Sequence, residues 1–289
     1  MRGALLALLL ATIGSGLAAI SAMAGAPTRP VEITAEVRLW RLDCGVMEFD
    51  NLDWFSDTYA FEGMSGAITD SCYLIRHGDK YLIWDTGLGE EILGAPRRVA
   101  PGVRAGLTET LVSQLAKIGV KPDQIAYVAV SHNHGDHISQ SASFPKATLL
   151  IGAQDFAEIS AKPAPPGLDP KPLAPWIDGG SPVDLVKGDK DVFGDGSVMM
   201  LSMPGHTEGH HGLLVRLKET GPVLLSGDLY HLKEQLPIRT VPSFNANRAE
   251  TLASMERYQT IAKNLGAVAI IQHEEDDIAK LPAFPQGAK

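Results

Sequence analysis

The sequence predicts an α+β fold in which two mixed β-sheets pack face to face and helices cover their outer faces. Two observations carry this prediction. Segments with the pattern of strands alternate with helical segments in two rough halves of the chain, and no linker separates the halves. The composition, 45% hydrophobic and 20% charged over 289 residues, is that of a globular protein long enough to bury a sizeable core. We therefore expect residues 35–289 to form one domain.

The first 24 residues have the layout of a secretory signal peptide. Arg2 precedes an apolar stretch from Ala4 to Ile13, and small residues lead to Ala24, after which we expect cleavage. An uncleaved membrane anchor is the alternative, because apolar and small residues nearly reach the roughly 20 that span a bilayer. With cleavage, residues 25–34 become an N-terminal extension, and the mature protein is periplasmic or secreted without stable membrane insertion.

The first half of the domain reads as antiparallel strands followed by a helix. Residues 48–69 mix acids, Gly and aromatic side chains without a period, and we interpret them as a long loop. Thr108 is the expected N-cap of a helix with Leu111 and Leu115 on one face, which ends at Gly119. The strands expected here are residues 31–47, 72–77 and 80–84, the last of which leads into Asp85-Thr86-Gly87.

In the second half, residues 125–130 form a short apolar strand that leads directly to a histidine-rich segment. Residues 162–182 are rich in proline and are expected to form a loop. We further expect strands at 147–151, 197–203, 211–217, 222–226 and 267–272, and helices at 153–161 and 248–265.

Four potential metal ligands lie directly after the strand at 125–130: His132, His134, Asp136 and His137. A tight loop at a strand end can turn several side chains toward one point. Imidazole nitrogen and carboxylate oxygen are ligands that zinc accepts in tetrahedral and five-coordinate sites. A solvated His-rich loop is the alternative, but this spacing favours metal binding.

Three further metal-type residues follow the ends of expected strands: His206, Asp228 and His273. A single His in such a place is more often a surface or core residue, but three of them beside the cluster make coincidence a poor explanation. A catalytic zinc keeps about three protein ligands and an open position, so seven candidate ligands are too many for one ion. The sequence therefore predicts two divalent metal ions per chain, which we expect to be zinc.

The order of these residues resembles that of the metallo-β-lactamase superfamily. The chain has His-x-His-x-Asp-His at His132–His137, Gly-His-Thr-x-Gly-His at Gly205–His210, and then Gly-Asp and a late His. The resemblance covers the chain from about residue 35 onward and implies an αββα sandwich with a binuclear centre between the sheets. It implies that His132, His134 and His206 hold the first metal, that Asp136, His137 and His273 hold the second, and that Asp228 bridges them.

Within the superfamily, the chain is most similar to the N-acyl homoserine lactonase branch. The Gly205–His210 segment, the hairpin that ends at Asp228 and the short strand before His273 carry this resemblance. Superfamily β-lactamases commonly place Cys where Asp228 stands. The lactonases are expected to carry a Tyr three residues after the bridging Asp, but His231 occupies that position here and Tyr230 lies one residue earlier. We expect one of these two side chains to contact the substrate carbonyl.

The resemblance implies a hydrolase that opens the lactone ring of N-acyl homoserine lactones, a quorum-quenching activity that fits the export expected from residues 1–24. Two cations about 3.5–4 Å apart can share a water, lower its pKa toward neutrality and polarise the carbonyl that the hydroxide attacks. Asp136 would orient or shuttle the proton to the leaving group. An organophosphate triesterase or aryl esterase with the same centre is one alternative, and a metal-binding protein without turnover is another.

Other polar residues are expected to support the ligands or to pack. Asp85-Thr86-Gly87 matches a family segment that braces the ligand loop, and a plain turn is the alternative. We interpret His210 as structural, and His211 and His77 as surface or packing residues.

The formal net charge of −9 opposes binding to nucleic acid, and the Arg97-Arg98 pair reads as part of a solvated loop. We therefore expect a small-molecule partner. Cys44 and Cys72 are either two small buried residues or one disulfide tolerated by an oxidising compartment.

Aromatic and apolar side chains gather in the expected loop at 48–69. They are Trp54, Phe55, Tyr59, Phe61 and Met64. They either form an apolar wall for the chain of a substrate or pack on the sheets, and both interpretations stay open.

Overall fold

A computed structural model describes residues 35–289, so the predicted signal peptide at 1–24 and the N-terminal extension at 25–34 lie outside the described residues. Within the described range, none of the helices combines the length and apolar character needed to cross a membrane. The strands are β1 (Val37–Phe49), β2 (Gly66–His77), β3 (Lys80–Trp84), β4 (Gly94–Ala100), β5 (Val103–Leu107), β6 (Ile125–Ala129), β7 (Thr148–Gly152), β8 (Val183–Val186), β9 (Lys190–Asp191), β10 (Val198–Ser202), β11 (His211–Leu217), β12 (Gly221–Leu225) and β13 (Val268–Ile270). The α-helices are α1 (Leu111–Lys117), α2 (Gly135–Ile138), α3 (Ala153–Ile159), α4 (Ala174–Ile177), α5 (Gln235–Ile238), α6 (Arg248–Leu265) and α7 (Glu275–Ile278).

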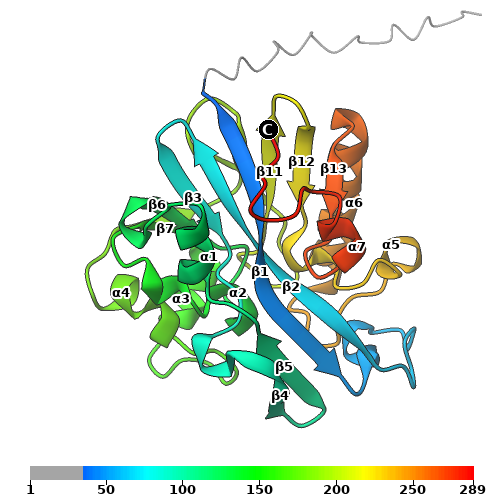
Figure 1. The fold of residues 1–289 in the computed structure, drawn as a ribbon. Helices are drawn as coiled ribbons and strands as arrows, with labels where there is room; N and C mark the ends of the chain where they lie inside the picture. Colours follow the sequence, from blue (N-terminus) through cyan, green and yellow to red (C-terminus); the bar gives the residue numbers. More distant parts are fainter. Residues whose placement is uncertain (1–34) are drawn as a thin grey trace, which may run out of the picture. The chain divides into compact units, whose positions relative to one another are not determined.

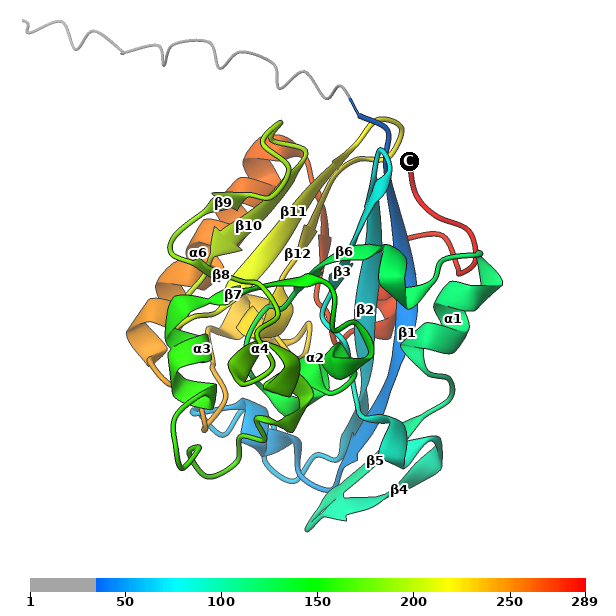
Figure 2. The same cartoon turned by 90° about the vertical axis from the view of Figure 1, so that its left-hand side faces the viewer.

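The strands form two mixed sheets. The larger has eight strands in the order β4-β5-β1-β2-β3-β6-β7-β8, and the smaller has five in the order β13-β12-β11-β10-β9. Parallel pairing begins where β3 meets β6, and the smaller sheet has its parallel pair at β12 and β13. Helices α1 and α3 lie on the outer side of the larger sheet, and α6 runs along the outer side of the smaller one (Figures 1 and 2). The predicted α+β fold with helices on the outer faces of two sheets is confirmed.

Alternation along the strands divides the apolar side chains among three layers. On β2, Tyr73 and Ile75 face the smaller sheet, whereas Cys72 and Leu74 face the helices outside. Tyr258 of α6 packs with Leu224 of β12 on the other outer face. Because both faces of each central strand are buried, the two sheets and their helices form one continuous packed unit.

The first hairpin is longer than the sequence analysis predicted. The expected loop at 48–69 is shorter, because β1 continues to Phe49 and pairs with Gly66 at the start of β2. The remaining loop contains a short 3-10 helix, η1, at Leu52–Phe55. Pairing across the hairpin therefore overrides the irregular local pattern of this segment.

The hairpin of β4 and β5 was not predicted. The Arg97-Arg98 pair lies on β4, where all residues but one are exposed, rather than in a loop. A strand without a buried face lacks the alternation that identifies strands in a sequence. The turn residue Gly102, with a φ of 74°, is the one local signal of this hairpin.

Three element boundaries also differ from the predictions. The N-cap of α1 is Thr110 rather than Thr108, because its side chain accepts a hydrogen bond from the backbone of Ser113. The proline-rich segment contains the short helix α4, which tolerates Pro175 in its first turn. The last strand ends at Ile270, so His273 lies in the turn beyond it.

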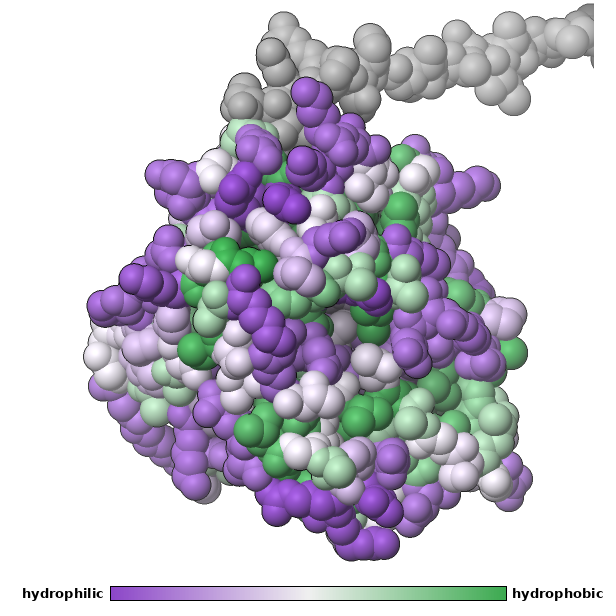
Figure 3. All heavy atoms as spheres, viewed as in Figure 1, coloured by the Kyte–Doolittle hydropathy of each residue, from purple (hydrophilic) through white to green (hydrophobic). Residues whose placement is uncertain are grey.

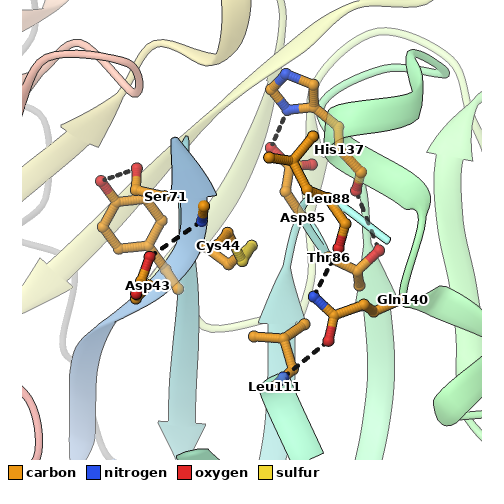
Figure 4. The surroundings of a disulfide bond; sticks show 12 residues. Asp43, Cys44, Ser71, Asp85, Thr86, Leu88, Leu111, His137 and Gln140 are labelled. Carbon is orange, nitrogen blue, oxygen red and sulfur yellow. Dashed lines mark hydrogen bonds and ion pairs between the residues drawn. A yellow bond between two sulfur atoms is a disulfide. The ribbon is translucent and has the colours of Figure 1, made fainter. Parts of the chain in front are cut away.

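Cys44 and Cys72 form a disulfide that joins β1 to β2, with a Cα–Cα distance of 5.7 Å. The turn at Thr86–Leu88 lies directly beside it (Figure 4). A Cβ on Gly87 would stand 2.5 Å from that of Cys44, so only glycine fits there, and the backbone N–H of Leu88 donates to the carbonyl of Cys44. The disulfide therefore supports the segment that follows β3.

Candidate metal centre

The structure brings the seven candidate metal ligands together in two groups that share Asp228. Within each group, one ligand atom per residue lies within 4.8 Å of the others. The first group is His132, His134, His206 and Asp228, and the second is Asp136, His137, Asp228 and His273. The grouping matches the assignment that the resemblance implied.

Strand ends of both sheets deliver these residues. Strand β6 leads to His132, and helix α2 carries Asp136 and His137. Asp228 lies in the 3-10 helix η6 (Gly227–Leu229), directly after β12. Because β13 runs parallel to β12, the turn after β13 brings His273 to the same edge, where its Nε2 lies 3.0 Å from Asp228 Oδ1. The centre therefore depends on the packing of the two sheets.

The second ring nitrogen of three histidines is held by a neighbour. His132 Nδ1 lies 3.0 Å from Ser131 Oγ, His137 Nδ1 lies 3.0 Å from Asp85 Oδ2, and His273 Nδ1 donates to Thr69 O at 2.9 Å. A bond at Nδ1 orients each ring with Nε2 toward the centre, and a metal ion bound there would take the place of the Nε2 proton that Asp228 favours on His137 and His273. These contacts aim the Nε2 atoms at the centre.

Asp85 is the main brace of the second group. Its carboxylate also accepts from the backbone N–H of Ser131 at 2.6 Å and from Gln272 Nε2 at 2.5 Å. Asp85 has a φ of 58°, a left-handed conformation that is uncommon for non-glycine residues and that aspartate tolerates better than most. Thr86 adds a bond from its N–H to His137 O at 2.7 Å, and Figure 4 shows both residues beside the ligand loop.

Asp228 is the point where the two groups meet. Its Oδ1 lies 3.1 Å from His137 Nε2, and its Oδ2 lies 3.4 Å from His206 Nε2. Burial alone would raise the pKa of Asp228, but the nearby His137, His273 and His231 hold it well below its usual value. Asp228 is therefore an ionised carboxylate placed between two clusters of imidazoles.

The buried groups of the centre fit divalent metal ions. His134 Nδ1 lies 2.9 Å from His132 Nε2 and 3.1 Å from His206 Nε2, and burial lowers the pKa of all three rings. Neutral imidazoles with converging lone pairs are what a metal ion requires. His137 Nε2 is buried and faces carboxylate oxygens of Asp228 and Asp136 at 3.1 and 3.6 Å, so donor atoms of three candidate ligands of the second group converge.

The two candidates for the substrate contact differ in position. The hydroxyl of Tyr230 accepts from Gln259 Nε2 at 2.9 Å and lies 3.4 Å from Met255 O, both on α6 and away from the centre. His231 Nε2 lies 3.1 Å from Asp228 Oδ2, and the ring stacks on Phe55 with centroids 4.6 Å apart. Of the two, His231 is the side chain at the metal centre.

The remaining histidines pack, as expected. His210 donates from Nδ1 to Met203 O and accepts from the N–H of Asp228, both at 2.9 Å, so it holds the backbone of a ligand. Burial lowers its pKa to about 3. His211 bonds to backbone carbonyls, and His77 stacks on Phe193.

A cavity of about 450 Å³ opens onto the metal centre. The residues His134, Asp136, Asp228 and His231, which lie together at the metal centre, form one part of its lining. Apolar side chains of β1, β2, β4, β5 and nearby loops form most of the rest, beside the polar Glu91 and Ser139; they are Met47, Phe49, Trp54, Phe55, Ile68, Leu88, Ile92, Val99, Ala105 and Phe244. Apolar surface is visible in the lower part of Figure 3, the end of the molecule that carries these segments.

The structure places side chains of the aromatic loop in both environments, some beside the cavity and some in the core. Trp54 and Phe55 line the cavity, whereas Phe61 is buried in the cluster beneath it. Tyr59 and Met64 are exposed and do not line the cavity.

Phe244 was not singled out in the sequence. It lies in the loop between α5 and α6, with ring centroids 6.2 Å from His134 and 5.8 Å from His206. It lines the apolar cavity and also a second, more polar cavity of about 470 Å³ beside His134 and Glu158. A lone Phe in an irregular segment carries no local signal of such a position.

Comparisons with known proteins agree with this geometry. Residues 66–273 match the family model of the metallo-beta-lactamase superfamily. The N-acyl homoserine lactonase AttM of Azorhizobium caulinodans is 30% identical over 225 residues, which cover 71% of this chain and 81% of that protein.

Solved structures share the fold. An N-acyl homoserine lactone hydrolase with the product N-hexanoyl-L-homoserine bound at its metal centre superposes with a TM-score of 0.74 at 20% identity, covering 88% of this chain and 99% of that one. The dizinc quorum-quenching lactonase AidC gives a TM-score of 0.62 at 18% identity, covering 82% and 87%. The chain therefore belongs to the metallo-beta-lactamase superfamily and is a metal-dependent hydrolase.

Proposed function

We propose that the protein opens the lactone ring of N-acyl homoserine lactones at a binuclear, zinc-containing centre. The observation that carries this proposal is the apolar cavity that is lined in part by Asp136, Asp228 and His231. An N-acyl homoserine lactone has a polar ring joined to an apolar chain, and the lining of this cavity is polar at the metal centre and mostly apolar elsewhere. The names of AttM, of the product-bound lactone hydrolase and of AidC support the same substrate class.

The cavity provides binding energy for the acyl chain. Its volume of about 450 Å³ lies within the range of small-molecule sites. Each methylene that leaves water gains about 0.8 kcal/mol, so several methylenes against Met47, Phe49 and Ile92 would hold the chain and direct the ring to the centre. We therefore expect longer acyl chains to bind more tightly.

The two ligand groups provide the chemistry. Divalent cations held by them would lower the pKa of a water molecule and polarise the carbonyl that it attacks. Asp136 lies at the junction of cavity and centre, with its Oδ2 3.6 Å from His137 Nε2 and part of its side chain exposed. From there it can take a proton and pass it to the ring oxygen as the ring opens.

His231, rather than Tyr230, is the side chain proposed to donate to the substrate oxygen on which charge builds. We expect His231→Ala to lower kcat by about 10²–10³, the loss measured for a single oxyanion donor, with metal content unchanged. Tyr230→Phe removes a hydroxyl that faces α6 and should leave kcat unchanged. Steady-state kinetics on one long-chain lactone would check both, and a loss confined to Tyr230→Phe would contradict the assignment.

The activity itself is tested by acid release from an N-acyl homoserine lactone, followed with a pH indicator. We expect turnover that chelation removes and zinc restores. A protein that opens no lactone but cleaves a chromogenic phosphotriester or aryl ester would show that the organophosphate triesterase or aryl esterase alternative is correct.

Export is a second part of the proposal and rests on the sequence of residues 1–24. We expect the mature chain to begin near Gly25 in the periplasmic fraction. N-terminal sequencing that finds Met1 in that fraction would contradict this.

A further inference from the structure

The first ligand group is assembled from two loops that follow strands of different sheets. His132 and His134 lie in the loop after β6 of the larger sheet, and His206 lies in the loop after β10 of the smaller sheet. Their nitrogen atoms converge to within 3.1 Å of His134 Nδ1. Something must therefore fix one loop relative to the other.

Asp155, in the first turn of α3, contacts both loops. Its carboxylate accepts from Thr207 Oγ1 at 2.8 Å and from the N–H of Gly209 at 2.7 Å, on either side of Glu208 in the second loop. Its backbone carbonyl accepts from Asn133 Nδ2 at 3.3 Å, and Asn133 separates the two histidines of the first loop.

Glu158, one turn further along α3, accepts from the same amide of Asn133 at 2.9 Å. One turn of α3 thus holds Asn133, which lies between His132 and His134, and Thr207, which directly follows His206.

The loop that carries His206 packs tightly against the start of α3. A Cβ on Gly209 would lie 2.7 Å from Asp155 Cγ, and a Cβ on Gly152, which caps α3, would lie 2.0 Å from Gly209 O. Both positions therefore require glycine because backbones approach closely there. The position of the loop is set by Asp155 and by the end of β7.

Burying the carboxylate of Asp155 at this position costs folding free energy. It is fully buried, no basic side chain of residues 35–289 forms an ion pair with it, and burial raises its pKa to about 7. Packing alone would be served better by an apolar residue of similar size. A carboxylate offers two acceptor oxygens in one plane, which matches the two donors of the second loop.

We propose that Asp155 is a positioning residue of the first metal group, which holds the His206 loop against the His132–His134 loop through α3. The inference concerns metal binding alone and does not depend on the lactone as substrate. Asp155 would serve the first group as Asp85 serves the second, where Asp85 bonds directly to His137 Nδ1.

The test is a metal titration of the metal-free full chain and its variants, with a chromophoric chelator as competitor. We expect Asp155→Ala to weaken the binding of one ion by about 10–100-fold, the usual loss for an outer support of a ligand, and to leave the other ion unaffected. Asp85→Ala is the matched control and should weaken the other ion. The single variants His206→Ala and His273→Ala show which ion occupies which site. The double variant His206→Ala/Asp155→Ala should therefore bind metal no more weakly than His206→Ala alone.

Two further variants keep the test valid if Asp155→Ala folds poorly. Asp155→Asn keeps an acceptor for the N–H of Gly209 and places an amide donor beside Thr207 Oγ1, so we expect it to restore most of the affinity. Thr207→Val keeps the shape of the side chain and removes one bond, so a smaller loss at the first site is expected.

Hydrogen exchange gives a readout that needs neither metal nor activity. In the metal-free protein, the amide of Gly209 should exchange faster in Asp155→Ala than in the parent, because its acceptor is lost. Equal weakening of both ions, or a lower melting temperature with both affinities unchanged, would show that Asp155 has only a general structural role and would overturn the proposal.

Discussion

At the residue scale, the chemistry of each histidine follows from the partners of its two ring nitrogens. His132, His137 and His273 use Nδ1 on Ser131, Asp85 and the carbonyl of Thr69, which leaves Nε2 for a metal ion. His210 uses both nitrogens on the backbone and has none left. The sequence analysis separated these two kinds of histidine, because the motif order distinguishes them.

His210 makes the stability of the metal-free protein depend on pH. Burial depresses its pKa from 6.5 to about 3, because the charged form of the ring loses its hydration there. The folded state therefore binds this proton less readily than the unfolded state, so its contribution to stability is complete above pH 6.5 and is lost as the pH falls toward 3.

The expected cost is about 1.4 kcal/mol of unfolding free energy per pH unit in this window. Denaturant titrations of the metal-free protein at pH 5 and pH 7 would check this. Between pH 7 and pH 5, the unfolding free energy of His210→Gln should fall less than that of the parent. An equal loss in both proteins would contradict the neutral, buried state of His210.

At the element scale, a strand or helix could be predicted from the sequence where one of its faces, or its whole surface, is buried. The strands before His132 and before Asp228 were found because they are apolar runs bounded by turn residues. The hairpin of β4 and β5 was missed because its exposed β4 has no alternation. The direction of Tyr230 was open because it follows the short helix η6 in an irregular segment, where no periodicity assigns a side chain to a face. Asp155 and Phe244 act through contacts distant in sequence, which no local pattern encodes.

The loop that carries η1 contains a matched pair of aromatic side chains. Trp54 lines the cavity and is partly exposed, whereas Phe61 is buried in the cluster below. We expect Trp54→Ala to raise KM for a long-chain lactone by about tenfold through lost apolar contact, with little effect on a short-chain lactone.

Phe61→Ala should lower the unfolding free energy by about 3 kcal/mol and leave KM unchanged. Kinetics on both chain lengths and denaturant unfolding of both variants would check this pair. A raised KM in Phe61→Ala together with an unchanged KM in Trp54→Ala would show that the cavity does not receive the acyl chain.

The disulfide joins β1 to β2 and lies beside the turn at Thr86–Leu88, which braces the ligand loop. It closes a sequence separation of 28 residues, for which the loss of chain entropy in the unfolded state predicts about 3–4 kcal/mol of stabilisation. We expect the double variant Cys44→Ala/Cys72→Ala to unfold at correspondingly lower denaturant concentration. The parent unfolded under reducing conditions is the control, and a midpoint unchanged in both cases would contradict this role.

At the scale of the whole molecule, each metal group draws ligands from both sheets. The first group combines the loop after β6 with that after β10, and the second combines α2 with the turn after β13. The centre can therefore form only when the sheets pack in the observed way. The motif order was sufficient to predict this grouping, because the resemblance supplies the long-range pairing that local patterns lack.

In the proposed function, the two ligand groups act together to open a lactone. The most direct measurement is turnover of a long-chain N-acyl homoserine lactone by the metal-free protein while zinc is added in known amounts. We expect activity to rise until two equivalents per chain are bound and then to stay constant, and His273→Ala to bind only one equivalent tightly and remain nearly inactive. Full lactone turnover at one equivalent, or two bound equivalents without any lactone opening, would show that the two ligand groups do not act together on a lactone.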